Sequence, residues 1–146
     1  MIIYLDSSVL ARSYLVDEVG HNDALAILQR IDVGLVTGSW SQIEVTGALV
    51  RAARGGRLNS TKLLRTFESD IGPGGRISLV SASQESVEEL SLSLVLEHGI
   101  RAMDAWHLAT GSLAIPSLLE TGEDMGFATR DEDQRSVAEL LGFHVV

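Results

Sequence analysis

The sequence predicts one α/β domain with three layers, in which a short and mainly parallel central sheet lies between layers of helices. Short apolar runs alternate along the chain with longer segments whose apolar residues recur at helical spacing. The first run, residues 2–5, is apolar without interruption, which is typical of a strand buried on both faces of a parallel sheet. With 146 residues, 45% of them hydrophobic, the chain can bury a sizeable core, so we expect residues 1–146 to form a single domain.

The first half of the chain predicts three strands and four helices. The strand over residues 2–5 ends at Asp6, and Ser7 or Ser8 is placed to cap a helix over residues 9–16. Asn59-Ser60 is placed to cap the fourth helix, which carries apolar residues on one face as far as Ile71. The other elements expected here are helices over 21–31 and about 41–54, strands over 33–37 and 77–80, and a turn at Gly72-Pro73-Gly74-Gly75.

The second half of the chain predicts three helices and two strands. Ser83 caps a helix that ends before Gly99, a residue type common just past a helix C-terminus. Residues 100–104 lead into a helix that runs through residue 113, and we interpret residues 112–126 as mostly loop. A strand over 127–129, a helix that begins around Asp131 and Gln134, and a last strand over 143–146 complete the domain.

Composition excludes several classes of protein. The chain has no cysteine, which excludes disulfides, thiolate metal ligands and a cysteine nucleophile. No uninterrupted apolar stretch approaches the length of a membrane span, and the N-terminus lacks the basic region of a signal peptide. We therefore expect a cytoplasmic protein with no membrane partner. The formal net charge of −9 argues against a surface that binds nucleic acid over its whole extent.

The positive charges are unevenly distributed. No acid occurs between Glu44 and Glu68, and 5 of the 11 basic residues fall within this gap, namely Arg51, Arg54, Arg57, Lys62 and Arg65. One interpretation is a solvated helix end followed by the exposed face of the next helix. The other is a basic rim beside an acidic crevice, which would steer a phosphate backbone towards that crevice.

Four acids stand where the predicted topology can bring them together. Asp6 and Asp131 follow strands directly, and Glu44 and Asp104 lie in the first turns of helices. Right-handed crossovers place the carboxyl ends of parallel strands at one edge of the sheet, where open α/β sheets bind ligands. Each acid also has a local explanation, because Asp6 and Asp131 can cap helices, Ser41-Gln42-Ile43-Glu44 fits a capping box, and Asp104 can complement a helix dipole.

Four carboxylates in one crevice need a source of positive charge. Each close pair would repel by roughly 4 kcal/mol at an effective dielectric constant of about 20. No lysine or arginine is adjacent in sequence to Asp6 or Glu44, so we expect a hard divalent cation to neutralise them. Oxygen ligands without cysteine suit Mg²⁺ or Mn²⁺, and carboxylate-bound Mg²⁺ commonly acts on phosphoryl groups.

The acids lie in motifs that together resemble those of the PIN-domain family. In chain order the motifs are Ile3-Tyr4-Leu5-Asp6-Ser7-Ser8, Ser41-Gln42-Ile43-Glu44-Val45, Asp104-Ala105-Trp106-His107-Leu108-Ala109-Thr110 and Thr129-Arg130-Asp131. The third motif closely resembles the family pattern Asp-Ala-x-His-Leu-Ala. The order and approximate spacing agree with the family from residue 1 to 146, and size and composition are most similar to its VapC toxins.

This resemblance implies a function and a set of site residues. It implies a Mg²⁺- or Mn²⁺-dependent endoribonuclease that hydrolyses phosphodiester bonds of RNA with metal-activated water. It further implies a homodimer and the toxin of a type II toxin–antitoxin pair, held inactive by a VapB-type antitoxin. The catalytic and metal-binding residues carried over are Asp6, Glu44, Asp104 and Asp131.

The resemblance and the charge pattern also indicate supporting residues. Ser8 would support the metal shell, with Thr129 as a weaker candidate. Asp133 could share or replace the role of Asp131, and Asp124 is a more distant choice. Residues expected to bind RNA or the antitoxin are Arg51, Arg54, Arg57 and Arg101, of which Arg101 could instead orient Asp104 from one turn away.

Two other functions are also compatible with the sequence. A catalytically silent PIN scaffold would act by protein association alone. A phosphoacceptor receiver domain also places acids and Mg²⁺ on a parallel sheet, but it needs a lysine after the last strand, and the only lysine is Lys62 on a predicted helix. We interpret His107 as a packed helix residue rather than a ligand, because its helix is apolar and hard cations prefer oxygen.

Overall fold

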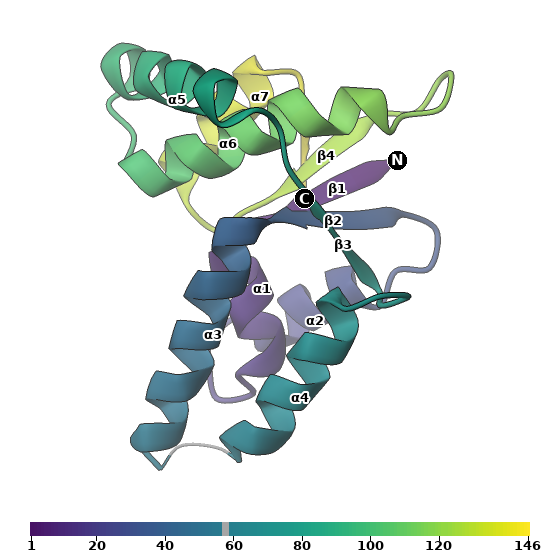
Figure 1. The fold of residues 1–146 in the computed structure, drawn as a ribbon, viewed down its shortest axis with the longest axis vertical. Helices are drawn as coiled ribbons and strands as arrows, with labels where there is room; N and C mark the ends of the chain where they lie inside the picture. Colours follow the sequence, from purple (N-terminus) through teal and green to yellow (C-terminus); the bar gives the residue numbers. More distant parts are fainter. Residues whose placement is uncertain (57–58) are drawn as a thin grey trace.

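The computed structural model describes residues 1–56 and 59–146, without the side chain of Ser60. Its strands form one parallel sheet in the order β3-β2-β1-β4-β5 (Figure 1). The parallel α/β architecture expected from the sequence is therefore confirmed. The strands are β1 (Ile2–Leu5), β2 (Gly34–Gly38), β3 (Ile77–Val80), β4 (Met125–Ala128) and β5 (His144–Val145).

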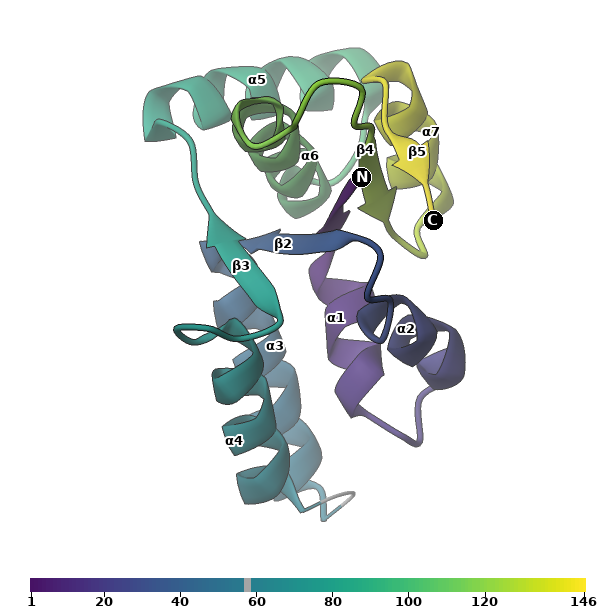
Figure 2. The same cartoon turned by 90° about the vertical axis from the view of Figure 1, so that its right-hand side faces the viewer.

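Helices cover both faces of the sheet and complete three layers (Figures 1 and 2). One layer holds α1 (Ser7–Tyr14), α2 (His21–Leu28), α3 (Ser39–Arg54) and α4 (Ser60–Ile71). The other holds α5 (Gln84–His98), α6 (Ala102–Ala114) and α7 (Glu132–Leu140). No helix in the described ranges combines the length and apolar character that crossing a membrane requires.

The central strand β1 is buried on both faces, as its uninterrupted apolar run predicts. Ile3 and Leu5 belong to the core on the side of α1 to α4, whereas Tyr4 belongs to the core on the side of α5 to α7. All three side chains are fully buried. Because successive side chains of a strand point to opposite faces, this short segment contributes to both cores at once.

Several predicted boundaries shift in the structure. Asp6 itself is the N-cap of α1, where Ser7 or Ser8 was expected, because its side chain accepts a hydrogen bond from the Ser8 N–H. Helix α3 begins at Ser39, directly after β2 and two residues before the expected start. Between residues 112 and 126 the structure is only partly loop: α6 continues to Ala114, a 3₁₀ turn spans Ile115–Ser117, and β4 begins at Met125.

A buried tyrosine joins α1 to α4. The Tyr14 ring packs edge-on against Phe67, with 5.3 Å between ring centroids. Its hydroxyl donates a 2.7 Å hydrogen bond to Asp70 Oδ2. Burial, together with the Asp70 acceptor, raises the pKa of the Tyr14 hydroxyl above its ordinary value, so Tyr14 remains a donor over the whole neutral range.

We predict that Tyr14→Phe lowers the free energy of unfolding by about 1.5 kcal/mol, because the ring still packs but Asp70 loses a charge-assisted hydrogen bond. Urea denaturation monitored by circular dichroism measures the change. Asp70→Asn is the matched control, since it keeps an acceptor oxygen and should cost less than Tyr14→Phe. Equal stability of Tyr14→Phe and the wild type would contradict the role of this bond.

Candidate active site

The four acids predicted from the sequence line one cavity. This cavity, of about 560 Å³, lies at the carboxyl edge of the sheet, where β1 leads into α1, β2 into α3 and β4 towards α7. Parallel strands present their carboxyl ends at a common edge, which explains why acids distant in sequence meet there. The lining residues are Asp6, Ser7, Ser8, Arg12, Glu44, Arg101, Ala102, Met103, Asp104, Arg130 and Asp131.

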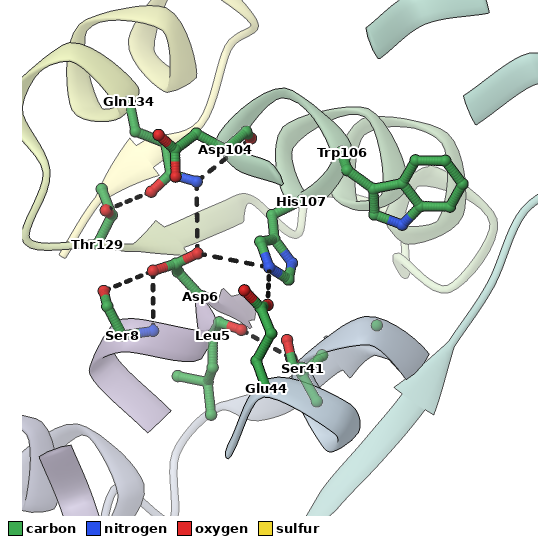
Figure 3. Close-up of polar contacts among 12 residues, drawn as sticks. Leu5, Asp6, Ser8, Ser41, Glu44, Asp104, Trp106, His107, Thr129 and Gln134 are labelled. Carbon is green, nitrogen blue, oxygen red and sulfur yellow. Dashed lines mark hydrogen bonds and ion pairs between the residues drawn. The ribbon is translucent and has the colours of Figure 1, made fainter. Parts of the chain in front are cut away.

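Asp6 is held in the cavity wall by its own helix. Its Oδ2 accepts hydrogen bonds from the Ser8 N–H at 3.0 Å and from the Ser8 hydroxyl. Its Oδ1 lies 3.4 Å from Gln134 Nε2 and 3.9 Å from His107 Nε2 (Figure 3). The residue is 4% exposed. Asp6 thus caps α1 with one oxygen and presents the other towards the remaining site residues.

Glu44 is positioned by a histidine rather than by a capping box. Because α3 begins at Ser39, Glu44 lies beyond its first turn, and its Oε2 accepts a 2.8 Å hydrogen bond from His107 Nε2 (Figure 3). His107 Nδ1 lies 3.0 Å from the Tyr4 hydroxyl, and the Gly38 N–H donates to the same hydroxyl oxygen at 3.0 Å. The capping-box explanation of Glu44 is therefore wrong.

These contacts define the direction of the hydrogen bonds from Tyr4 to Glu44. The Tyr4 hydroxyl accepts from Gly38, so its own hydrogen is available to His107 Nδ1. Burial raises the pKa of Tyr4, so it keeps that hydrogen. His107 can then carry a hydrogen on Nε2 and donate it to Glu44. This hydrogen bond lowers the pKa of the Glu44 carboxyl group below its ordinary value.

The prediction that His107 is a packed helix residue was incomplete. The side chain is buried, with 1% exposure, in the interior of α6. It nevertheless connects the core residue Tyr4 to a carboxylate of the cavity. The sequence offered one signal for this role, because His107 is part of the third motif, three residues after Asp104.

Asp104 and Asp131 share one guanidinium group. Arg101 Nε donates to Asp104 Oδ2 at 2.8 Å, and Arg101 Nη2 donates to Asp131 Oδ2 at 2.6 Å. Burial raises the pKa of Asp104 in spite of Arg101, and the negative charges of Asp6 and Asp131 add to the increase. Arg101 therefore orients Asp104, as one of the sequence interpretations expected, and reaches a second carboxylate as well.

Gln134 is a site residue that the sequence did not identify. It is buried, and its Nε2 lies 3.4 Å from Asp6 Oδ1 and 3.3 Å from the Asp104 carbonyl oxygen. Its Oε1 accepts a hydrogen bond from the Thr129 hydroxyl, which also accepts one from the Asp131 N–H. Thr129 thus supports the carboxylates through Gln134. The sequence suggested Gln134 only as a residue near the start of α7.

The cavity holds more positive charge than the sequence suggested. Arg12 and Arg130 line it together with Arg101, so three arginines face the four carboxylates. Arg130 also pairs with Asp23 at 3.2 Å. Arg12 follows Asp6 by six residues on α1 and Arg130 is next to Asp131, and both line the cavity.

Other predicted residues lie away from this cavity. Arg51 and Arg54 occupy the last turn of α3, at the end of the helix far from the sheet (Figure 1). Arg57 lies outside the described residues. Asp133 is exposed on α7 and does not line the cavity, so the structure favours Asp131 as the fourth acid. Asp124 precedes β4 and lies 3.9 Å from His144.

The donor types suit a hard divalent cation, because the cavity presents carboxylate oxygens from four residues. The spacing of the side chains does not suit one as they stand. Over residues 1–56 and 59–146, no three side chains of aspartate, glutamate, histidine or cysteine come close enough together to hold a metal ion. Arg101 contributes to this arrangement, since it already supplies positive charge to Asp104 and Asp131.

The layers, the strand order and the acidic edge define a PIN-like α/β fold. One similar solved structure is FitAcB from Neisseria gonorrhoeae, with a TM-score of 0.62, 22% identity, and coverage of 98% of this chain and 95% of that chain. Another is FitAB bound to an IR36 DNA fragment, with a TM-score of 0.61, 23% identity, and coverage of 99% and 93%. Neither a protein-family model nor a curated protein sequence matches the chain.

We predict that His107→Phe raises the pKa of Glu44, because the carboxylate loses the hydrogen bond that favours its charged form. NMR titration of the side-chain carboxyl carbon of Glu44 measures the pKa. Since the low pKa in the folded state stabilises the protein above the ordinary glutamate pKa, the variant should also lose less stability on acidification. His144→Phe, on the exposed strand β5, is the control, and an unchanged Glu44 midpoint in His107→Phe would refute the assignment.

Proposed function

We propose that this chain is a divalent-metal-dependent endoribonuclease and the toxin component of a toxin–antitoxin pair. The observation that carries the proposal is the convergence of four carboxylates in one cavity at the carboxyl edge of a PIN-like sheet. The acids come from four separate segments of the chain, and all four are at least partly withdrawn from solvent. Such a concentration of negative charge is costly unless it serves to bind a cation.

Asp6, Asp104 and Asp131 would hold the cation, with Glu44 completing the set. A bound divalent cation would supply Lewis acidity towards a phosphate oxygen and would activate water for attack. Ser8 and Gln134 hold Asp6 by hydrogen bonds, and His107 holds Glu44. The chain's part in catalysis would be to hold these carboxylates around one cavity, where they would draw closer together as the cation binds.

The three arginines would bind the phosphates of RNA. Arg12, Arg101 and Arg130 line the same cavity as the acids, and guanidinium groups recognise phosphate oxygens with paired hydrogen bonds. Arg101 would exchange Asp104 and Asp131 for a phosphate when a cation takes over the charge of these two acids. This arrangement reconciles a net charge of −9 with a polyanionic substrate.

The partners follow by analogy. The structure of FitAB contains a bound DNA fragment. We propose that this chain pairs with an antitoxin of VapB type that itself binds DNA. The antitoxin would inhibit the chain by filling the acidic cavity. Arg51 and Arg54, remote from the cavity, are then better placed to bind the antitoxin than to contact the scissile phosphate. We further propose that the toxin is a homodimer.

One observation favours a second candidate, the catalytically silent scaffold. Arg101 already pairs with Asp104 and Asp131, so the negative charge of these two carboxylates is offset in part without a metal. Calorimetric titration with Mn²⁺ at neutral pH separates the two functions. Saturable binding that depends on Asp6 and Asp104 supports the nuclease, whereas absence of binding supports the scaffold.

We predict that Asp6→Asn and Asp104→Asn each reduce Mn²⁺-dependent RNA cleavage by at least about 100-fold, because a neutral amide is a poorer ligand for a hard cation. Asparagine caps helices as well as aspartate does, so Asp6→Asn should remain folded. A gel assay on labelled RNA measures cleavage, and calorimetry measures Mn²⁺ affinity. Asp133→Asn, an exposed change on α7, is the matched control. Full activity in both site variants would exclude the proposed mechanism.

We predict that Arg101→Gln increases Mn²⁺ affinity by about threefold to tenfold. The guanidinium competes with the cation for Asp104 and Asp131, because it forms an ion pair with each of these carboxylates. Calorimetry measures the affinity in the absence of RNA. Arg130→Gln is the control, because it removes a charge from the same cavity, and the ion-pair partner of that charge is Asp23 rather than Asp104 or Asp131. Weaker Mn²⁺ binding by Arg101→Gln would show that the two cations do not compete.

A further inference from the structure

We propose that a second cavity, walled by Trp40 and Trp106, binds an unpaired base of the RNA strand whose phosphate lies in the acidic cavity. This inference rests on the proposed ribonuclease function and adds a substrate subsite to it. The second cavity has a volume of about 470 Å³, within the range of about 300–1,000 Å³ typical of small-molecule sites. It shares none of its lining residues with the acidic cavity.

The second cavity lies along the same edge of the sheet. Ser39 and Trp40 follow the carboxyl end of β2, and residues 80–82 continue from the carboxyl end of β3. Trp40 precedes Glu44 by one helical turn of α3, about 6 Å of rise. On α6, Trp106 is two residues from Asp104 and points away from the acids (Figure 3). Neighbouring nucleotides of one strand could therefore occupy both cavities.

The two indole rings provide a surface for stacking. Their centroids are 6.2 Å apart and their planes are inclined by 76°, an edge-to-face arrangement that fixes each ring by its contact with the other. Trp40 remains 41% exposed, so its ring is open to a ligand. Stacking on an aromatic side chain is the common way in which proteins bind the bases of single-stranded RNA.

The charge of the cavity favours a base over a phosphate. Among the residues that the structure describes, no lysine or arginine lines it, and Glu88 is the one charged residue of its wall. Glu88 Oε1 accepts a 2.7 Å hydrogen bond from Gln84 Nε2. An acidic, cation-free wall repels phosphate. Gln84 and Glu88 instead offer a hydrogen-bond donor and an acceptor side by side. Hydroxyl groups are added by Ser39, Ser81 and Thr110. This combination suits the polar edge of a base.

A protein side chain is the competing occupant, and the structure offers it a different place. The adjoining cleft between α5 and α6 is lined mainly by apolar groups of Leu92, Val95, Ala102 and Trp106. Leu92 is 61% exposed there. That cleft suits an apolar side chain of a partner, whereas the cavity next to it combines aromatic rings with an amide, a carboxylate and hydroxyl groups.

Trp40 and Trp106 are the only 2 tryptophans in the chain, and both line this cavity, so tryptophan fluorescence reports on it. Trp106 also lines the adjoining cleft, whereas Trp40 does not. The experiment titrates the full-length protein, in EDTA to prevent cleavage, with a single-stranded RNA decamer of mixed sequence. We expect saturable quenching, and much weaker quenching with a decamer of abasic nucleotides. Trp40→Ala should weaken RNA binding, measured by anisotropy of labelled RNA, by about tenfold or more. Trp40→Phe, which keeps a stacking ring, should recover most of the affinity.

The outcomes distinguish the subsite from the proposed function. Ile31→Ala removes an exposed apolar side chain before β2, remote from the cavity, and should leave RNA binding unchanged. Base-dependent quenching without any Mn²⁺-dependent cleavage would keep the subsite and overturn the nuclease. Cleavage with no quenching, and with equal RNA affinity in Trp40→Ala, would overturn the subsite. A second result would also overturn the subsite. If Trp40→Ala converted a dimer to a monomer, measured by light scattering, and left RNA affinity unchanged, the cavity would be a protein interface.

Discussion

The whole site depends on the balance of charge at one edge of the sheet. Parallel strands deliver carboxylates to this edge, and at close range in a partly desolvated cavity the acids raise each other's cost of ionisation. The chain offsets this cost with three kinds of group: the Arg101 guanidinium, the hydrogen-bond donors Ser8 and Gln134, and His107. Burial still dominates at Asp104, whose pKa is raised despite its ion pair. A bound cation would offset the negative charge that these side chains neutralise only in part.

Tyr4 connects the stability of the fold to the geometry of this site. Its ring stacks on Phe127 with 5.2 Å between centroids, so β1 and β4 hold it rigidly. Its hydroxyl meets both His107 and the Gly38 N–H. A Cβ at Gly38 would come within 2.7 Å of that hydroxyl oxygen, which explains why a glycine stands where β2 ends and α3 begins. The position of Glu44 is thus determined by a core tyrosine two hydrogen bonds away.

The sequence was informative where position along the chain determines position in space. Asp6 and Asp104 were found because strand ends and helix starts meet at one edge of a parallel sheet. Whether Asp131 or Asp133 is the fourth acid depended on where α7 begins. Because the two acids are only two residues apart, the sequence did not decide between them. Arg12 and Gln134 were missed because their roles depend on how α1 and α7 rotate and pack, and no local pattern encodes this. Arg130 lies in the loop beside Asp131, where the sequence did not indicate which way its side chain turns. The sequence suggested from charge that Arg51 could lie on a basic rim of the cavity. The length of α3 instead places Arg51 at the far end of that helix.

Capping and site formation appeared as alternatives in the sequence, but the structure satisfies both with different oxygen atoms. Asp131 Oδ1 accepts the Gln134 N–H at the start of α7, while its Oδ2 accepts from Arg101. Asp6 divides its oxygens in the same way, with Oδ2 on Ser8 and Oδ1 towards Gln134. A helix N-terminus stabilises negative charge and orients the carboxylate that caps it. The caps therefore make the acidic edge possible, because each holds a charged group in a defined direction and leaves one oxygen for a ligand.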